Sequence, residues 1–268
     1  MKVLRTVAEV REAVREPRRR GERIGLVPTM GAFHAGHMAL IRAAREASDV
    51  VVVSLFVNPT QFDAAEDLAR YPKDEASDAQ AAEAEGVDLL FAPTADELFP
   101  PGFDTWVDPG ELGTVLEGAA RPGHFRGVAT VCTKLFSIVE PDIAWFGQKD
   151  AQQVAVIRRV VSDLNLRPEI RVVETVRDAD GLALSSRNMR LSPAEREAAL
   201  VLPRSLEAGL VSFRAGGDAE HAARQTLIEA GADIDYVAAA QFDRPTLVAA
   251  IRVGSTRLID NVVLEKLG

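Results

Sequence analysis

Hydrophobic and polar positions along the chain follow two patterns. Short apolar runs such as Val50–Phe56 show no polar alternation, which is typical of strands buried on both faces of a parallel sheet. Other stretches repeat apolar residues at helical spacing, as at Val7, Val10 and Val14, which predicts amphipathic helices. These patterns predict helices over Thr6–Arg15, Met38–Ala47, Glu75–Glu85, Gly127–Glu140 and Ala151–Leu164, and strands over Ile24–Val27, Val50–Phe56, Val87–Ala92, Ile143–Phe146 and Ile170–Thr175.

Strands and helices thus alternate from Ile24 to Thr175, an order that predicts an α/β fold with a doubly wound parallel sheet. The pattern changes after Thr175. There we expect helices over Pro193–Gly209 and Ala219–Gly231, strands over Asp235–Ala240 and Ile251–Leu258, and a tail at Asn261–Leu264. The sequence therefore predicts two domains, a Rossmann-like domain over 1–176 and a smaller α+β domain over 177–268.

Composition and charge argue against several classes of protein. A formal net charge of −9, from 31 basic and 40 acidic residues, disfavours a nucleic-acid partner. The longest apolar stretch is too short to cross a bilayer, so we expect no membrane association. The single cysteine, Cys132, cannot form an intrachain disulfide; we expect it in the core of a cytoplasmic protein. The basic run Arg15–Arg23 contains Pro, Gly and Glu, and is expected to be a solvated loop.

Candidate chemistry begins where the first predicted strand of the sheet gives way to a helix. Residues 28–37 read P-T-M-G-A-F-H-A-G-H, with His34 and His37 three residues apart. A helix N-terminus offers unpaired backbone N–H groups and partial positive charge, and imidazoles can donate hydrogen bonds to phosphate oxygens. Gly31 and Gly36 would let the backbone approach an anion closely. The segment therefore indicates a polyphosphate site, although H-x-G-H alone also fits two histidines at an ordinary helix start.

Three further polar loops follow predicted strands, at the edge where the carboxyl ends of parallel strands meet. They are V-N-P-T-Q-F at 57–62, G-Q-K-D at 147–150 and the segment 176–188, which contains L-S-S-R-N. Lys149 at a helix start, and the hydroxyls and guanidinium of Ser185, Ser186 and Arg187, suit phosphate oxygens. Each loop could be an ordinary turn, but four polar loops at one edge favour a single binding site.

Other common mechanisms lack their motifs. The sequence contains no G-x-G-x-x-G, no P-loop, no G-x-S-x-G, no H-E-x-x-H and no cysteine cluster. Nothing indicates a covalent nucleophile, so catalysis would depend on positioning and electrostatics.

Seven ordered motifs carry a family resemblance that extends from about Leu4 to Asn261. They are P-T-M-G-x-x-H-x-G-H, V-N-P-T-Q-F, R-Y-P-K, H-F-R-G-V, F-G-Q-K-D-x-Q-Q, L-S-S-R-N and G-S-T-R-L-I-D-N. Together they resemble the pantothenate synthetase (pantoate–β-alanine ligase) family of the H-x-G-H nucleotidyl-transfer superfamily. The resemblance implies an ATP-dependent, AMP-forming ligase of pantothenate and coenzyme A biosynthesis. The carboxylate of (R)-pantoate would attack the α-phosphorus of ATP to give pantoyl adenylate and pyrophosphate, and β-alanine would then displace AMP.

The same resemblance assigns roles to individual residues. His37 would be the nominal proton donor, with electrostatic stabilisation the larger effect, and Gln61 and Gln153 would hold pantoate, with Gln61 also near β-alanine. The catalytic set would be His34, His37, Lys149, Ser185, Ser186 and Arg187. The ATP-binding set would be Met30, Gly31, Ala32, Phe33, His34, Ala35, Gly36, His37, Gly147, Gln148, Lys149, Asp150, Val176, Leu184, Ser185, Ser186 and Arg187.

Further expectations from the resemblance concern the metal and the assembly. Mg²⁺ should bridge the ATP phosphates with few protein ligands, Asp78 being a candidate. The C-terminal domain would be a lid that presents Leu182–Arg187 and excludes water from the mixed anhydride. Arg126 would lie in a segment that covers the active site, and the protein would be a homodimer.

Three positions depart from the family pattern: Phe33 replaces leucine, Asp63 replaces glycine and Ala151 replaces tyrosine. They lie beside the expected site and remove no group that the chemistry needs.

Two other hypotheses stay open at this point. The first is a different nucleotidyl transferase, against which the neutral amides of Gln61 and Gln153 argue, because amides suit a hydroxy acid better than a phosphorylated substrate. Length and charge disfavour a class I tRNA synthetase. The second is a non-catalytic nucleotide sensor, against which the intact His34, His37 and Lys149 argue, as do Ser185 and Ser186.

Overall fold

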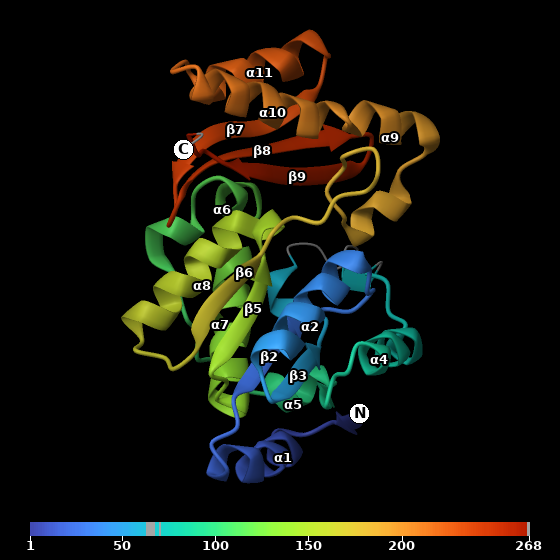
Figure 1. Ribbon diagram of the computed structural model, residues 1–268, viewed down its shortest axis with the longest axis vertical. Helices are drawn as coiled ribbons and strands as arrows, with labels where there is room; N and C mark the ends of the chain where they lie inside the picture. The colour runs from blue at the N-terminus through green and yellow to red at the C-terminus, as the bar shows by residue number, and fades with distance from the viewer. Residues whose placement is uncertain (63–67, 70, 267–268) are drawn as a thin grey trace. The chain divides into compact units, whose positions relative to one another are not determined.

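The computed structural model describes residues 1–62, 68–69 and 71–266, so Asp63 and Arg70 lie outside the described residues. The chain divides into two compact units, coloured along the sequence in Figure 1. The first unit comprises Met1–Phe146 and Val156–Val173, and the second comprises Gly147–Ala155 and Glu174–Gly268.

The first unit is built on a six-stranded sheet with the order β1-β4-β3-β2-β5-β6. The strands are β1 (Lys2–Leu4), β2 (Ile24–Thr29), β3 (Val50–Leu55), β4 (Leu89–Phe91), β5 (Ile143–Gly147) and β6 (Glu169–Val173). The pairs β1–β4, β4–β3, β3–β2 and β2–β5 are all parallel, which confirms the Rossmann-like fold. The chain runs outward from β2 through β3 to β4 and returns to place β5 beside β2. The strand order therefore reverses at β2 and β5, where such sheets bind ligands beyond the carboxyl ends of the strands.

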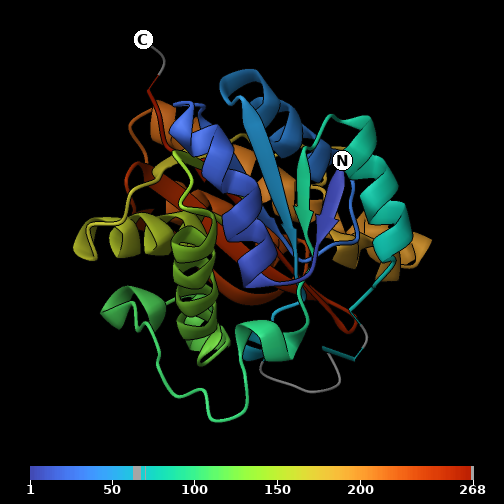
Figure 2. The ribbon, with the colours of Figure 1, turned by 90° about the horizontal axis from the view of Figure 1, so that it is seen from below.

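Helices flank this sheet (Figures 1 and 2). They are α1 (Val7–Arg19), α2 (Ala35–Ala47), α4 (Glu75–Ala84), α5 (Ala95–Leu98), α6 (Glu117–Ala120), α7 (His124–Val139) and α8 (Ala151–Asp163). One cluster of buried side chains joins Ile41 of α2 and Ala82 of α4 to Val27, Val51 and Val53 of the sheet. Residues that alternate with these along a strand point to the opposite face. There α1 and α7 pack beside each other and both contact β2.

The basic run Arg15–Arg23 is only partly a loop, and the prediction was wrong for its first half. Helix α1 continues to Arg19 with Pro17 inside it. Ion pairs one turn apart support this extension, with Arg15 2.7 Å from Glu12 and Arg19 2.7 Å from Glu16. Pro17 has no N–H to donate to the Ala13 carbonyl, so the last turn of α1 has one backbone hydrogen bond fewer, and the helix ends two residues later.

The second unit contains a three-stranded antiparallel sheet and helices packed on it. The strands are β7 (Asp233–Gln241), β8 (Pro245–Val253) and β9 (Thr256–Val263), and the helices are α9 (Pro193–Ala199), α10 (Val201–Arg214) and α11 (Ala219–Glu229). Leu206 and Leu227 from the helices pack with Leu247 and Ile251 from the sheet. This smaller α+β element was predicted correctly as a class.

Two of its predicted elements were wrong in detail. The strand expected over Ile251–Leu258 is a hairpin, in which Val253 pairs with Thr256 and Gly254 has a left-handed φ of +56°. The helix expected over Pro193–Gly209 is divided at Leu200 into α9 and α10.

Cys132 lies in the core as predicted, and burial raises the pKa of its thiol to about 12. Within the residues that the structure describes, no helix combines the length and apolar character that a membrane span requires.

Candidate active site

The loop that leaves β2 has a constrained backbone. Gly31 and Ala32 both have left-handed φ angles, +87° and +55°. This backbone conformation is unfavourable for a residue other than glycine, so at Ala32 it needs stabilising hydrogen bonds. Asp78 in the first turn of α4 provides them, because its two carboxylate oxygens accept hydrogen bonds from the Ala32 and Phe33 N–H groups at 2.9 and 2.8 Å. A Cβ at residue 31 would lie 2.7 Å from the same carboxylate. Asp78 is only 4% exposed, so it stabilises the turn from the buried side.

His34 and His37 cap the helix that follows. His34 is the N-cap of α2, and its Nδ1 accepts a hydrogen bond from the Gly36 N–H at 3.1 Å. His37 Nδ1 accepts from the His34 N–H at 3.3 Å, and the two ring centroids are 4.2 Å apart. Since a backbone N–H can only donate, both Nδ1 atoms are acceptors and each neutral ring carries its proton on Nε2. The helix N-terminus therefore carries two imidazole N–H donors suited to an anion.

The loop that leaves β3 orients Gln61. It contains the 3-10 helix η1 (Pro59–Gln61), whose N-cap is Asn58. The Asn58 amide donates to Gln61 Oε1 at 3.0 Å, and the Gln61 amide donates to Met30 Sδ at 3.1 Å. Gln61 is thus placed against the loop that carries the histidines, as expected for two parts of one site.

Helix α7 and the residues before it hold the backbone of η1. His124 Nδ1 donates to the Gln61 carbonyl at 2.9 Å, and Arg121 donates to the same oxygen at 3.0 Å. Gly127 packs directly on η1, where a Cβ would lie 2.3 Å from the Thr60 carbonyl oxygen. Arg126 does not take part, since its guanidinium stacks 4.5 Å from the ring centroid of Trp106.

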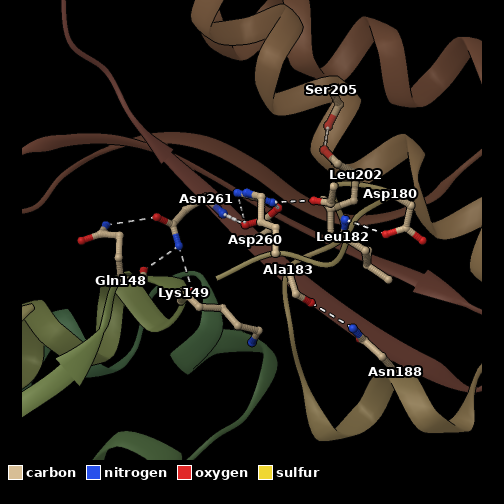
Figure 3. A network of polar contacts seen from close by, with 12 residues as sticks. Gln148, Lys149, Asp180, Leu182, Ala183, Asn188, Leu202, Ser205, Asp260 and Asn261 are labelled. Atoms are coloured by element: carbon tan, nitrogen blue, oxygen red, sulfur yellow. Dashed lines mark hydrogen bonds and ion pairs between the residues drawn. The ribbon is translucent and has the colours of Figure 1, made fainter. Parts of the chain in front are cut away.

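The remaining predicted residues belong to the second unit. Lys149 lies in the 3-10 helix η3 (Gln148–Asp150), with its side chain 17% exposed and its Nζ 3.7 Å from Asp150 Oδ1. Gln153 lies half-buried in the first turn of α8. Figure 3 shows the polar network around η3, in which Asn261 of β9 contacts Gln148 and Lys149.

The L-S-S-R-N segment has its own local support. Ser185 caps the 3-10 helix η4 (Ser186–Arg190), because its hydroxyl accepts a hydrogen bond from the Arg187 N–H at 3.3 Å. The Leu184 N–H donates to the Val176 carbonyl at 2.9 Å, which joins two positions predicted to contact the nucleotide. Asn188 donates to the Ala183 carbonyl at 3.0 Å.

The geometry does not fit a protein-built magnesium site at Asp78. Both of its oxygens already accept turn N–H bonds, and Asp78 is therefore better explained as a structural acceptor. Over residues 1–62, 68–69 and 71–266, no group of three or more His, Cys, Asp or Glu side chains could hold a metal ion.

Three supporting residues were not predicted from the sequence: Asn58, His124 and Asn261. Each lies inside a motif that was recognised, so the motif was the available signal. Each has a partner far away in the chain: Gly127 lies 69 residues from Asn58, Gln61 lies 63 residues from His124, and Gln148 lies 113 residues from Asn261. Sequence spacing alone does not reveal such contacts.

Comparisons with known proteins agree with this geometry. A family model described as pantoate-beta-alanine ligase matches residues 2–263. A pantothenate synthetase from Pelotomaculum thermopropionicum is 51% identical over 282 residues, covering 100% of both chains, and one from Roseiflexus castenholzii is 52% identical over 280 residues, covering 99% of this chain and 100% of the relative.

Solved structures give the same result. A crystal structure of pantothenate synthetase from Thermus thermophilus has a TM-score of 0.92 at 43% identity, covering 98% of this chain and 99% of the other. A pantoate-beta-alanine ligase from Francisella tularensis, described as complexed with beta-gamma ATP and beta-alanine, has a TM-score of 0.86 at 35% identity, covering 98% of both chains.

Proposed function

The chain belongs to the pantoate–β-alanine ligase family, and from this premise we propose that it joins pantoate to β-alanine in two steps that consume ATP. The Francisella tularensis relative is described as complexed with beta-gamma ATP and beta-alanine, which supports ATP and β-alanine as substrates. The observation that carries the proposal is the reciprocal capping of His34 and His37, because it commits both rings to donate through Nε2 at a helix N-terminus.

In the first step, a carboxylate oxygen of (R)-pantoate forms a bond to the α-phosphorus of ATP. The bond from that phosphorus to the bridging oxygen of the β-phosphate breaks, and pyrophosphate leaves. His34, His37 and Lys149 would donate hydrogen bonds to the phosphate oxygens on which charge develops, with His37 the nominal proton donor. Pyrophosphate is a good leaving group, so electrostatic stabilisation would contribute more than proton transfer.

In the second step, the β-alanine amine attacks the acyl carbon of pantoyl adenylate. The bond from that carbon to the phosphate oxygen breaks, AMP leaves with the oxygen, and an amide forms. Gln61 and Gln153 would hold the pantoyl group through its hydroxyls and carboxyl, and Gln61 would also lie near β-alanine. The contact with Asn58 supports this role, because it fixes the orientation of the Gln61 amide and still leaves that amide able to form further hydrogen bonds.

The nucleotide would contact the Met30–His37 loop, Gly147–Asp150, Val176 and Leu184–Arg187. Ser185, Ser186 and Arg187 would bind phosphate oxygens and, as part of a C-terminal lid, keep water from the mixed anhydride. Mg²⁺ would accompany ATP mainly through phosphate oxygens. A homodimer in the cytoplasm completes the proposal.

Omission of single substrates tests this function directly. The purified protein is incubated with ATP, pantoate and β-alanine, and AMP is measured. We expect AMP only when pantoate is present, with sustained turnover only when β-alanine is added. AMP release without pantoate, or no release with all three substrates, would refute the ligase.

A further inference from the structure

The motif G-S-T-R-L-I-D-N ends in two buried polar residues that have no role in the chemistry described above. Asp260 is 2% exposed and Asn261 is 4% exposed, both within β9 (Figure 3). Buried polar groups are costly unless they form hydrogen bonds, so the partners of Asp260 and Asn261 indicate why the strand carries them.

The Asn261 side chain forms three hydrogen bonds with residues of η3. Its Nδ2 donates to the carbonyl oxygens of Gln148 and Lys149, both at 2.9 Å. Its Oδ1 accepts a hydrogen bond from Gln148 Nε2 at 3.1 Å. One amide therefore holds two successive carbonyls of the short turn that carries Lys149, and the third bond fixes which way the amide faces.

Asp260 anchors the strand from which Asn261 extends. Its two oxygens accept hydrogen bonds from the Arg177 guanidinium at 2.6 and 3.0 Å, a two-point contact that holds both planes in register. Oδ1 also accepts from the Asn261 N–H at 2.8 Å. Arg177 also forms a β-bridge with Ala183, just before Leu184–Arg187. Asp260 is therefore linked through Arg177 to the second segment that is proposed to bind phosphate.

From these contacts we infer that Asn261 is a positioning residue for adenylate formation, acting through the backbone of Lys149. This positioning role rests on the proposed function, because only that function brings Lys149 into contact with phosphate. A 3-10 turn of three residues has few hydrogen bonds of its own, and the Asn261 amide supplies two of the contacts that hold η3. The amide fixes the point from which the flexible lysine side chain extends, and small misplacements of such a group reduce rate strongly.

The test replaces Asn261 with aspartate, which has nearly the same shape but cannot donate to either carbonyl. Pantoate-dependent exchange of pyrophosphate into ATP, measured without β-alanine, should fall about tenfold to a hundredfold, with the loss in kcat rather than in the KM for pantoate. The matched control is Ser205→Ala, which removes a buried bond to the Leu202 carbonyl elsewhere in the same unit. The control should stay within about threefold of the unaltered protein.

A double-mutant cycle separates positioning from general support of the fold. In a Lys149→Ala background, Asn261→Asp should cause less than about a threefold further loss, because its effect passes through Lys149. Equal losses in both backgrounds would overturn the inference, as would an Asn261→Asp protein within about threefold of the unaltered one.

If Asn261→Asp does not fold, Asn261→Ala, which buries no charge, is measured in the same way. Failure of both variants to fold would show a structural role and also overturn the inference. Absence of exchange in the unaltered protein would instead refute the proposed function itself.

Discussion

At the scale of single residues, the groups proposed to contact substrate are held by hydrogen bonds within the protein. His34 and His37 each accept a backbone N–H at Nδ1, and the Gln61 amide is held between Asn58 and Met30. Groups fixed in this way need little reorganisation during reaction, which is the main source of electrostatic catalysis. Substitution of one such group should therefore affect a particular step and leave the fold intact.

Lys149→Ala should reduce pantoate-dependent pyrophosphate exchange about 10²- to 10³-fold, the usual effect of losing one charged contact in a transition state. The protein should unfold at an unchanged temperature, because Lys149 is paired only loosely with Asp150. Lys134→Ala is the matched control, since Lys134 lies over the Phe103 ring at 4.6 Å and has no proposed role. An exchange rate within about tenfold of normal would remove Lys149 from the transition state.

Gln61→Ala and Gln153→Ala should separate pantoate binding from nucleotide binding. Each should raise the KM for pantoate roughly tenfold to a hundredfold, equivalent to about 1–3 kcal/mol, because polar groups of the substrate lose their partners. Titration calorimetry should show an unchanged Kd for ATP. Gln225→Ala, which removes an exposed contact to Glu229, is the control. If Gln153→Ala weakened ATP as much as pantoate, the residue would belong to the nucleotide site or to the fold.

Cys132 should react slowly with thiol reagents. Burial raises the pKa of its thiol from 9.0 to about 12, so near pH 8 the reactive thiolate is about 10³-fold rarer than in an unfolded chain. Alkylation at pH 8 should therefore be slow in the native protein and fast in denaturant. The native state holds this proton more tightly, so its contribution to stability is present at neutral pH and declines as pH rises from about 9 towards 12. Equal alkylation rates in the two states would contradict the burial.

At the scale of elements, the loop after β2 depends on α4. Asp78 accepts hydrogen bonds from the Ala32 and Phe33 N–H groups and so supports the left-handed turn at Gly31 and Ala32, which places His34 at the start of α2. A structural acceptor and a magnesium ligand at this position differ in one respect: only loss of a magnesium ligand would be offset by added Mg²⁺.

Asp78→Asn should lower the free energy of unfolding by about 1–3 kcal/mol and weaken ATP binding, because one of the two N–H groups loses its acceptor and the other keeps only a neutral one. Added Mg²⁺ should not restore ATP binding. Asp74→Ala is the control: it removes the N-cap bond to the Ser77 N–H of the same helix, costing about 1 kcal/mol without changing ATP affinity. Full recovery of Asp78→Asn at high Mg²⁺ would favour the metal role.

Elements also show where prediction from sequence succeeds. The uninterrupted apolar run Val50–Phe56 and the Ala-rich stretch before Ser48 are clear signals of a buried strand and a helix, and both were placed within a few residues of β3 and α2. The hairpin at Gly254 was missed because its turn is very short: only Gly254 and Ser255 separate the paired residues Val253 and Thr256. In the site, motifs located the residues that are proposed to face substrate. The partners that orient them, such as Asn261, were hidden because they lie on other elements.

At the scale of the whole molecule, the residues proposed for the reaction are divided between the two compact units. His34, His37 and Gln61 belong to the first, and Lys149, Gln153 and Ser185–Arg187 belong to the second. Each set is ordered by contacts within its own unit, so neither unit alone carries the complete set of proposed ligands. The central claim that connects them is an acyl adenylate formed from pantoate and ATP.

Isotope transfer tests this claim most directly. Pantoate labelled with ¹⁸O in its carboxylate is converted with unlabelled ATP and β-alanine, and the products are examined by mass spectrometry. An adenylate intermediate leaves one carboxylate oxygen on the α-phosphorus, so AMP should carry one ¹⁸O for each amide formed. Unlabelled AMP, or ADP with labelled inorganic phosphate, would contradict the account, because it would place activation at a different phosphorus or on a different path.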